Sequence, residues 1–287
     1  MIASEPRRVP STDGYPLAAA VFRPPAPRAI QQVILVCSAM GVRQTHYFDF
    51  AEYVAERGRA VITFDYRGIG SSAPPRLRGF RADLEDWGRR DVAAMIDQAR
   101  REFPEARLSV VAHSVGGQIF GLAPNNGEVQ DLLALGSQSG YWRHWTGAWR
   151  LRVWLLWHLF IPVLSPTLGY FPAPWFGLGR SIPAGVARMW AHWGRHPDYL
   201  LGRIGDGGRE GYQRFAGRLR ALTASDDVIA PAPAVQAMLQ FYPAARREFR
   251  LVHPTELGVS QIGHFGYFRE RIGRQLWPSE MDWLFDS

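Results

Sequence analysis

The feature that most constrains this chain is a repeated alternation of short apolar runs with segments of helical spacing. The apolar runs lack polar alternation, which is typical of strands that are covered on both faces. Strands that alternate with helices predict a parallel sheet wrapped by helices. The predicted strands of this kind are residues 33–37, 60–64, 108–112, 132–135, 219–223 and 249–252.

Other local signals complete this pattern. Two extended segments, 7–11 and 17–22, flank Asp13-Gly14, which indicates a hairpin, and the prolines of 24–27 break the chain after it. Two apolar stripes with helical spacing separate the first three strands of the predicted parallel sheet. The first stripe is Phe48, Ala51, Val54 and Ala55, and the second is Trp87, Val92, Met95, Ile96 and Ala99.

The alternation stops between about residues 137 and 211, a stretch that is too long for an ordinary loop. This stretch contains eight of the eleven tryptophans and many glycines and prolines. We therefore predict an α/β core formed by residues 1–136 and 212–287, with a helical cap, residues 137–211, inserted into it.

Ser114 stands where a predicted strand changes into a helix. The sequence Ala112-His113-Ser114-Val115-Gly116-Gly117 directly follows the strand and has small residues two positions before and after the serine. A nucleophile on a sharp strand-to-helix turn requires this pattern, and the amino terminus of the next helix stabilises negative charge. Ser114 is therefore the predicted nucleophile. We expect the His113 side chain to point away from it and to pack.

A serine hydroxyl needs a base that removes its proton. The base must lie on a later loop at the same edge of the sheet. His264 satisfies this condition, because Gly263-His264-Phe265-Gly266 follows the last predicted strand. His253 abuts a strand end and precedes Pro254, so we expect a structural role for it. His264 is therefore the predicted general base.

The imidazole in turn needs a carboxylate that fixes its tautomer. Asp227 follows the predicted strand 219–223 and has a proline four residues on, and it is the predicted acid. The adjacent Asp226 is the alternative, although we expect it to cap the turn or the next helix. Segment 136–139, after the preceding strand, offers no carboxylate.

The oxyanion of acyl transfer needs two backbone N–H donors. Val115, directly after the nucleophile, is expected to supply one of them. The other is expected from Ser38-Ala39-Met40-Gly41, the loop after strand 33–37. We favour Met40, with Ala39 as the second choice.

These residues resemble the α/β-hydrolase superfamily over nearly the whole chain. One shared motif is the D-x-R-G-x-G-x-S loop from Asp65 to Ser72. More narrowly, Asp86-Trp87-Gly88 with Asp91 resembles a bacterial branch near the serine aminopeptidase (S33-like) hydrolases. It implies a mostly parallel, eight-stranded sheet flanked by helices. The chain departs from the family pattern in having Ser38-Ala39 where His-Gly is usual, and Ala112 where the elbow prefers glycine.

Several other functions are disfavoured. The net charge of +7 comes entirely from arginine, and no nucleic-acid recognition motif accompanies it. Segment 68–73 imitates a dinucleotide fingerprint, but Pro74-Pro75 prevents a helix from starting there. His192 and His196 have metal-ligand spacing but no third ligand nearby. We therefore predict no cofactor, no metal and no nucleic-acid partner. Cys37 is the only cysteine, which excludes an intrachain disulfide.

The expected location is the cytoplasm, because the first residues lack the basic start and apolar run of a signal peptide. The most apolar run, 153–164, contains His158 and Pro162, and we expect it to be too short to span a bilayer. The run 150–164 is also suited to lie on an anionic membrane surface, so peripheral membrane contact through the cap remains an alternative. The sequence predicts no oligomeric state.

The composition of the cap predicts the substrate. Its tryptophans make it apolar, as ligand sites mostly are. From residue 137 to residue 205, Asp198 is the only acid against seven arginines. An aminopeptidase would need carboxylates for the cationic amine of its substrate. We therefore expect a carboxylesterase-like serine hydrolase that acts on a small ester or thioester with an apolar acyl part. A substrate that also carries an anionic end is compatible with this expectation. Acyl transfer by the same triad and a non-catalytic binding module are the alternatives.

Overall fold

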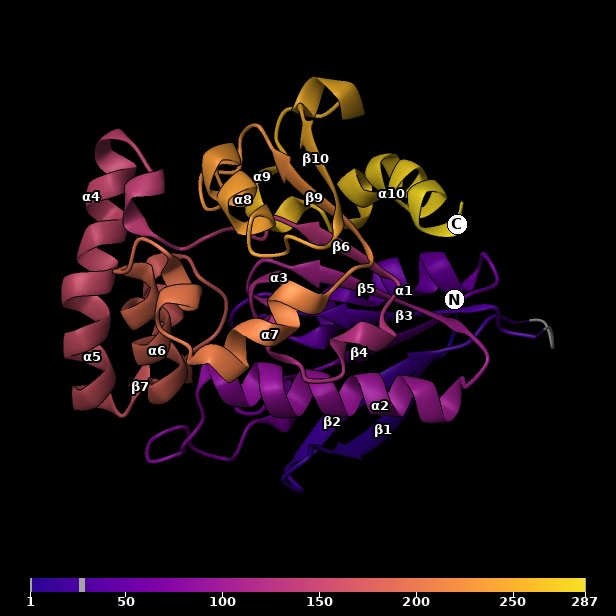
Figure 1. Ribbon diagram of the computed structural model, residues 1–287, viewed down its shortest axis with the longest axis horizontal. Helices are drawn as coiled ribbons and strands as arrows, with labels where there is room; N and C mark the ends of the chain where they lie inside the picture. The colour runs from indigo at the N-terminus through magenta and orange to yellow at the C-terminus, as the bar shows by residue number, and fades with distance from the viewer. Residues whose placement is uncertain (1, 26–28, 287) are drawn as a thin grey trace.

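The computed structural model describes residues 2–25 and 29–286, so the predicted break at 24–27 lies partly outside the described residues. Its centre is an eight-stranded sheet of order β1-β2-β4-β3-β5-β6-β9-β10 (Figure 1). The strands are β1 (Glu5–Pro10), β2 (Pro16–Phe22), β3 (Gln32–Cys37), β4 (Ala60–Phe64), β5 (Arg107–His113), β6 (Asp131–Leu135), β9 (Arg218–Ala224) and β10 (Arg246–Val252).

The sheet is antiparallel only at one edge. β1 pairs with β2, and β2 with β4, in antiparallel fashion, and every pair from β4 to β10 is parallel. The central strands β3, β4 and β6 are buried along their whole length, which explains their continuous apolar runs. The predicted mostly parallel sheet is confirmed, as is the hairpin around Asp13-Gly14.

Helices cover both faces of the sheet. On one face, α1 (Phe48–Ala55) and α10 (Glu270–Phe285) share a core with alternate residues of the strands. The other face is covered by α2 (Ala93–Glu102), which continues the π-helical turn Asp86–Val92, and by α3 (Val115–Ile119) and α8 (Ala232–Leu239). The carboxyl ends of β3, β5, β9 and β10 therefore meet at one edge, where ligands bind in open α/β sheets.

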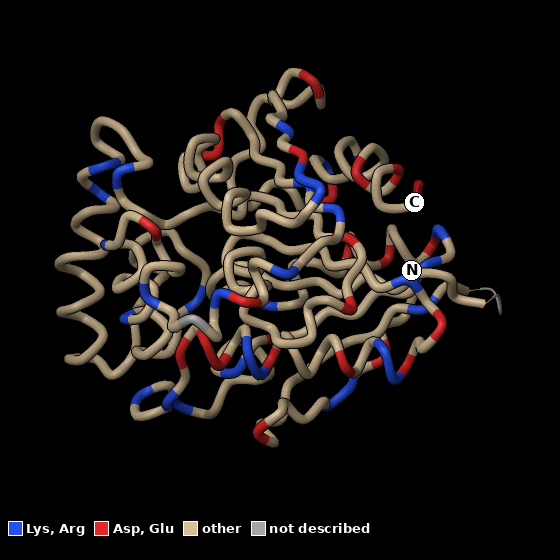
Figure 2. Tube along the Cα trace, viewed as in Figure 1, with Lys and Arg blue, Asp and Glu red and all other residues tan. Residues whose placement is uncertain are grey.

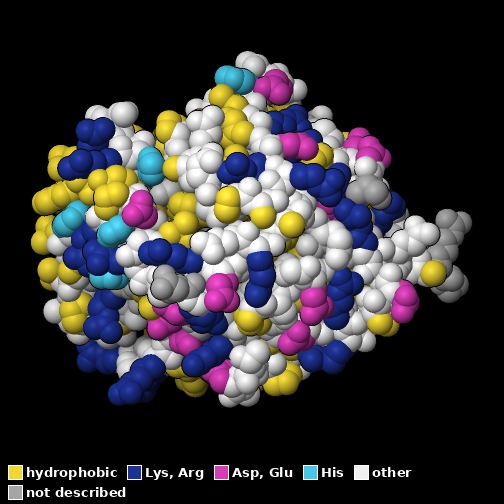
Figure 3. Space-filling model, in the orientation of Figure 1, with side chains coloured by type: hydrophobic (Ala, Val, Ile, Leu, Met, Phe, Trp, Pro, Cys, Tyr) yellow, Lys and Arg dark blue, Asp and Glu magenta, His cyan; other side chains and the backbone are white. Residues whose placement is uncertain are grey.

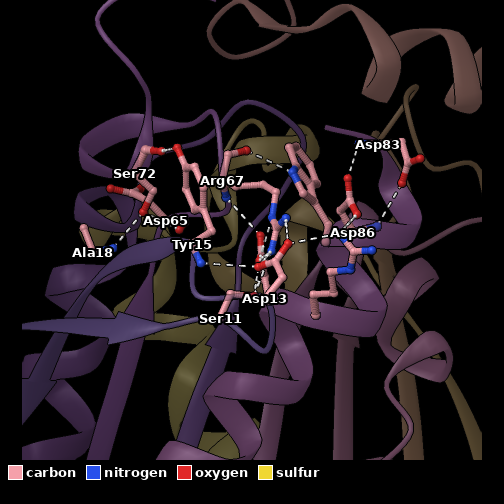
Figure 4. A network of polar contacts seen from close by, with 12 residues as sticks. Ser11, Asp13, Tyr15, Ala18, Asp65, Arg67, Ser72, Asp83 and Asp86 are labelled. Carbon is pink, nitrogen blue, oxygen red and sulfur yellow. Dashed lines mark hydrogen bonds and ion pairs between the residues drawn. The ribbon is translucent and has the colours of Figure 1, made fainter. Parts of the chain in front are cut away.

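The loop after β4 is a structural brace. The Arg67 guanidinium donates to Asp91, on the helical turn before α2, over distances of 2.6 and 2.9 Å, and to Asp13, on the β1–β2 hairpin, over 2.7 and 2.9 Å (Figure 4). Asp65 accepts hydrogen bonds from the backbone N–H groups of Gln44 and Ser71. The loop from Asp65 to Ser72 thus fixes neighbouring loops to one another.

A large insertion separates β6 from β9. It contains α4 (Gly147–Leu155), α5 (Ile161–Leu168), the short strands β7 (Tyr170–Phe171) and β8 (Ile182–Pro183), and α6 (Ala184–Gly194), which form the left end of the molecule in Figure 1. The predicted boundary at residue 211 falls within α7 (Asp206–Arg214). In α7, the Tyr212 hydroxyl donates to the carbonyl of Gln118 in α3. Because α7 packs on the core, we place the end of the insertion before it.

One expectation about the insertion is wrong. The apolar run was expected to be too short to span a bilayer, but it is part of a continuous 22-residue helix, Gly147–Leu168. By length and composition, this helix is long and apolar enough to cross a membrane. Pro162 lies inside this helix and does not end it; a π-helical turn, Leu156–Phe160, ends two residues before the proline.

Candidate active site

Ser114 occupies a sharp turn between β5 and α3. Its φ of 52° and ψ of −115° lie in a region that a non-glycine residue adopts only under strain. The turn requires close backbone contacts, since a Cβ on Gly116 would lie 2.4 Å from the Cys37 carbonyl oxygen. A Cβ on Gly117 would lie 2.4 Å from Ser137 Oγ. The small residues that predicted the turn are therefore required by packing against β3 and the loop after β6.

Asp227 and His264 are brought together from the loops after β9 and β10. The distance from His264 Nδ1 to Asp227 Oδ2 is 2.8 Å, and both side chains are buried. Asp226 points elsewhere, because its carboxylate accepts the backbone N–H groups of Ile262 and Gly263, at 2.9 and 3.1 Å. It thus positions the loop that carries His264, and the expectation that it caps its own turn or the next helix is wrong.

Tyr267 is a member of this site that sequence reasoning missed. Its hydroxyl donates to Asp227 Oδ2 at 2.7 Å and accepts the Ala224 N–H at 2.9 Å. Burial raises the pKa of Asp227, but His264, Tyr267 and the Ala230 N–H outweigh it and hold that pKa below its ordinary value. The Asp227 carboxylate therefore stays ionised. The spacing of three residues from His264 to Tyr267, one helical turn, was the available signal.

Gly136 makes the space that this pair of side chains occupies. Its φ is +56°, and a Cβ there would lie 3.1 Å from His264 Nδ1 and 3.2 Å from Asp227 Oδ2. Its N–H donates to the Leu222 carbonyl of β9 at 2.8 Å. The backbone of β6 thus approaches the imidazole as closely as only glycine allows.

The structure also separates the two candidates for the second oxyanion donor. The Ala39 N–H donates to the Tyr47 hydroxyl at 2.8 Å, so it is already engaged. This leaves Met40, which we favoured, and the predicted donor role of Met40 and Val115 stays a prediction. The Ser38 hydroxyl, at the position where the related sequences have histidine, contacts the Phe64 carbonyl at 3.3 Å.

His113 points away from the elbow, as expected, but it also connects two loops. Its Nδ1 lies 3.0 Å from the Tyr47 hydroxyl and its Nε2 lies 2.9 Å from the backbone oxygen of His264. Burial holds the pKa of His113 well below its ordinary value, so the ring is neutral. Because the Tyr47 hydroxyl donates to Nδ1, the Nε2–H donates to His264. This chain of bonds joins the oxyanion loop to the histidine loop beneath Ser114.

The last contact of the predicted triad is not formed as a hydrogen bond. Within the residues that the structure describes, none joins the Ser114 hydroxyl to the His264 ring. Such contacts are often long in the absence of substrate and tighten when it binds. The His113 bond nevertheless holds the His264 backbone next to the elbow. His253, by contrast, is exposed and begins the turn Pro254–Leu257 with Glu256, which is the structural role we expected.

Two of the hollows that border the site bear on the nature of the substrate. An apolar cavity of about 380 Å³ lies between the insertion and the Asp227 loop, and its lining includes Trp149, Leu156, Phe160, Trp175, Val228 and Ile229. The other hollow, of about 350 Å³, touches Gly41, next to Met40, and Phe265, next to His264. Its remaining lining includes Arg43, His46, Arg180 and Arg269. Neither lining includes Ser114, which lies between the loops that these hollows border.

The fold and part of the sequence match known proteins. Residues 28–155 match the family described as serine aminopeptidase, S33, and no curated protein matches the chain. A soluble variant of monoglyceride lipase from Saccharomyces cerevisiae, with a substrate analog, has a TM-score of 0.69 and 13% identity, over 99% of this chain and 94% of that one. Est1E from Butyrivibrio proteoclasticus, with ferulic acid bound, has a TM-score of 0.64 and 16% identity, over 96% and 97%. A malate-bound thermophilic esterase from Thermogutta terrifontis has a TM-score of 0.60 and 14% identity, over 98% of each chain.

Proposed function

We propose that this chain, which has the fold of the α/β-hydrolases, is a serine hydrolase acting on carboxylic esters or thioesters. The observation that carries the proposal is the buried bond between His264 Nδ1 and Asp227 Oδ2, 2.8 Å long, beside a serine in a strained turn. This bond fixes the tautomer whose Nε2 is free to accept a proton.

The proposed reaction has two halves, formation of an acyl-enzyme and its hydrolysis, and the same residues act in both. Ser114 Oγ loses its proton to His264 Nε2 and attacks the substrate carbonyl carbon, while the N–H groups of Val115 and Met40 stabilise the oxyanion. His264 then returns the proton to the departing alcohol or thiol, and an acyl-enzyme remains. A water molecule, activated by His264, releases the acid and restores the serine. Ionised Asp227 stabilises the imidazolium in both halves.

We propose that the acyl part of the substrate is apolar. The cavity beside the Asp227 loop supports this, since its lining is dominated by tryptophan, leucine and phenylalanine. A buried Trp145 Nε1–H donates to the Val228 carbonyl at 2.9 Å, so the insertion is fixed to the loop that carries Asp227. Apolar walls with few polar groups are typical of sites for small ligands.

An anionic end of the substrate is supported by the hollow beside Met40. Arg43, Arg180 and Arg269 are exposed there, and among the described residues none of them forms an ion pair with an acid. The backbone N–H of Arg180 donates to the Gly41 carbonyl at 2.8 Å, so the insertion and the oxyanion loop form one wall. Unpaired guanidinium groups around a hollow favour a carboxylate or phosphate.

The first test is labelling with a fluorophosphonate probe. The parent chain should be labelled on Ser114, as mass spectrometry of the adduct would show, and Ser114→Ala should not be labelled. The matched control is Ser225→Ala, a change of an exposed serine on the Asp227 loop, which should be labelled like the parent. Labelling of Ser114→Ala at the parent's rate, or a parent that is not labelled, would refute the proposed nucleophile.

A second test compares three substrates: a neutral acyl ester, the same ester with a terminal carboxylate, and an amino-acid arylamide. We expect the esters to be cleaved faster than the arylamide. Arg43→Gln with Arg269→Gln should raise KM for the carboxylate ester at least about fivefold and leave the neutral ester unchanged, because only the former loses charge-assisted bonds. Arg271→Gln, a change of an exposed arginine outside the hollow, is the control. Faster arylamide cleavage would overturn the ester assignment, and equal KM changes for both esters would overturn the anionic end.

A further inference from the structure

Among the described residues, none packs over the outer face of the long helix in the insertion. The buried side of Gly147–Leu168 is a stripe of residues four apart, Val153, Trp157, Ile161 and Ser165. The opposite side is also apolar, with Leu151, Leu159 and Val163 exposed to 58%, 46% and 50%. A surface helix of a globular protein normally places polar residues there. We call these three residues the outer stripe.

Further apolar side chains extend the outer stripe into a patch. Trp175, on the short turn Ala173–Phe176, is 70% exposed, and Trp149 and Trp154 are also exposed. In Figure 3, hydrophobic side chains gather at the left edge of the molecule, over α4 and α5. An exposed apolar patch rimmed by charge marks an interaction site, and tryptophan is enriched where proteins meet the surface of a bilayer.

Arginine predominates among the charges of this part of the chain. Arg143, Arg150 and Arg152 lie at its amino-terminal end, and Arg78 donates to the carbonyls of Thr167 and Leu168 at its carboxyl-terminal end. Between residues 137 and 205 the only acid is Asp198. Figure 2 shows the resulting predominance of arginine over acidic residues in this part of the chain. The complementary partner is therefore an anionic surface.

The helix Gly147–Leu168 is fixed to the rest of the insertion through its buried side. Trp157, on the buried stripe, donates from Nε1 to the Gly140 carbonyl at 3.0 Å and packs edge-on against Trp190 of α6. The same helix forms a wall of the apolar cavity through Trp149, Val153 and Leu156, and Trp175 lies at both the cavity and the patch. The apolar cavity therefore lies next to the exposed apolar patch, so a lipid acyl chain at the patch would be close to the cavity.

We propose that this face is a peripheral membrane-binding surface that docks on anionic lipid, with the helix Gly147–Leu168 lying in the plane of the interface. The apolar outer stripe would enter the boundary between headgroups and acyl chains, while the arginines at both ends would contact lipid phosphates. Docking of this kind requires no catalysis, so it stands or fails separately from the proposed serine chemistry.

The test is co-sedimentation of the full chain with vesicles of phosphatidylcholine alone and of phosphatidylcholine with phosphatidylglycerol. We expect binding to the anionic vesicles that weakens as salt rises. Leu151→Ser with Leu159→Ser and Val163→Ser should lower the partition coefficient at least about tenfold. Arg143→Gln with Arg152→Gln should lower it roughly fivefold per arginine on anionic vesicles only.

Matched controls separate this surface from a general effect. Leu251→Ser removes an exposed apolar side chain on β10, and Arg271→Gln removes an exposed arginine on α10, and both should bind like the parent. The outer-stripe variant should still hydrolyse a short soluble ester like the parent, because its three residues are not part of the cavity lining. That activity also reports that the variant is folded.

Four outcomes would overturn the proposal. The first is no sedimentation with either vesicle, and the second is sedimentation that the outer-stripe variant does not weaken. The third is a parent dimer, seen by light scattering, that the outer-stripe variant abolishes while vesicles bind neither protein, which would make the face an interface between copies. Bound protein that only detergent, and neither high salt nor alkaline carbonate, releases would point to a spanning helix and would also overturn it.

Discussion

At the scale of single residues, the site depends on positions that carry no reactive group. Asp227 is held by the backbone N–H groups of Ile229 and Ala230 and by the Tyr267 hydroxyl, so its carboxylate has one orientation relative to His264. Gly136 supplies the space for the His264 ring and the Asp227 carboxylate. Neither Tyr267 nor Gly136 would react with a substrate, yet both set the geometry of groups that we propose do.

Gly136→Ala should lower kcat for ester hydrolysis by about tenfold to a hundredfold, because its Cβ would displace the His264 ring and small misplacements are costly in catalysis. Gly79→Ala is the matched control, since Gly79 also has a positive φ, +83°, but a Cβ there would have no neighbour within 4 Å. Both changes should cost roughly 1 kcal/mol of stability through backbone strain. Thermal unfolding and steady-state kinetics on both variants would check this. An unchanged kcat in Gly136→Ala would contradict the steric role.

At the scale of elements, the loops are held by buried ion pairs. Arg67 joins the hairpin, the loop after β4 and the turn before α2, and its side chain is 5% exposed while that of Asp91 is fully buried. The Trp87 Nε1–H donates to the Arg67 carbonyl at 3.0 Å. The motifs that resemble the superfamily at these positions thus act as braces for the edge of the sheet, at a distance from the proposed chemistry.

Arg67→Gln should lower the free energy of unfolding by about 3–5 kcal/mol, because it leaves the Asp91 carboxylate buried without its charge partner. Arg90→Gln is the control. Arg90 also pairs with Asp13, at 3.0 Å, but is 48% exposed, and exposed pairs contribute less than about 1 kcal/mol. Urea unfolding of the two variants would measure the difference. Similar losses in both would show that Arg67 is no more than a surface contact.

At the scale of the whole molecule, the carboxyl and amino edges of the parallel strands differ in role. The carboxyl edge holds the proposed site. At the amino edge, Asp131 is buried at the start of β6 between Arg107, at the start of β5, and Arg218, at the start of β9. Burial raises the pKa of Asp131, but hydrogen bonds from Arg107, Arg218 and Ser109 outweigh it and keep that pKa below its ordinary value. This cluster ties three parallel strands together.

The sign of the resulting pH dependence follows from linkage. A carboxyl group whose pKa is lowered in the folded state stabilises the fold at pH values above its ordinary pKa, 3.8. This contribution is lost as the pH falls through the folded-state pKa. Asp131→Asn should therefore be less stable than the parent at pH 7, and its stability should fall less steeply below about pH 4. Asp282→Asn, at an exposed position on α10, is the control. Parallel curves of unfolding free energy against pH for the parent and Asp131→Asn would contradict this assignment.

The sequence by itself determined the strands, the sheet type and the three loops that carry Ser114, Asp227 and His264. These depend on local rules, namely burial on both faces of a strand and small residues around a sharp turn. Only the tertiary structure decided which of two adjacent acids meets His264, that Ala39 is engaged by Tyr47, and that Tyr267 and Gly136 shape the site. It also decided that the run around Pro162 is one exposed helix. Each of these depends on contacts between segments far apart in the chain or on the continuation of a helix through a proline, and hydrophobic periodicity contains no information about either.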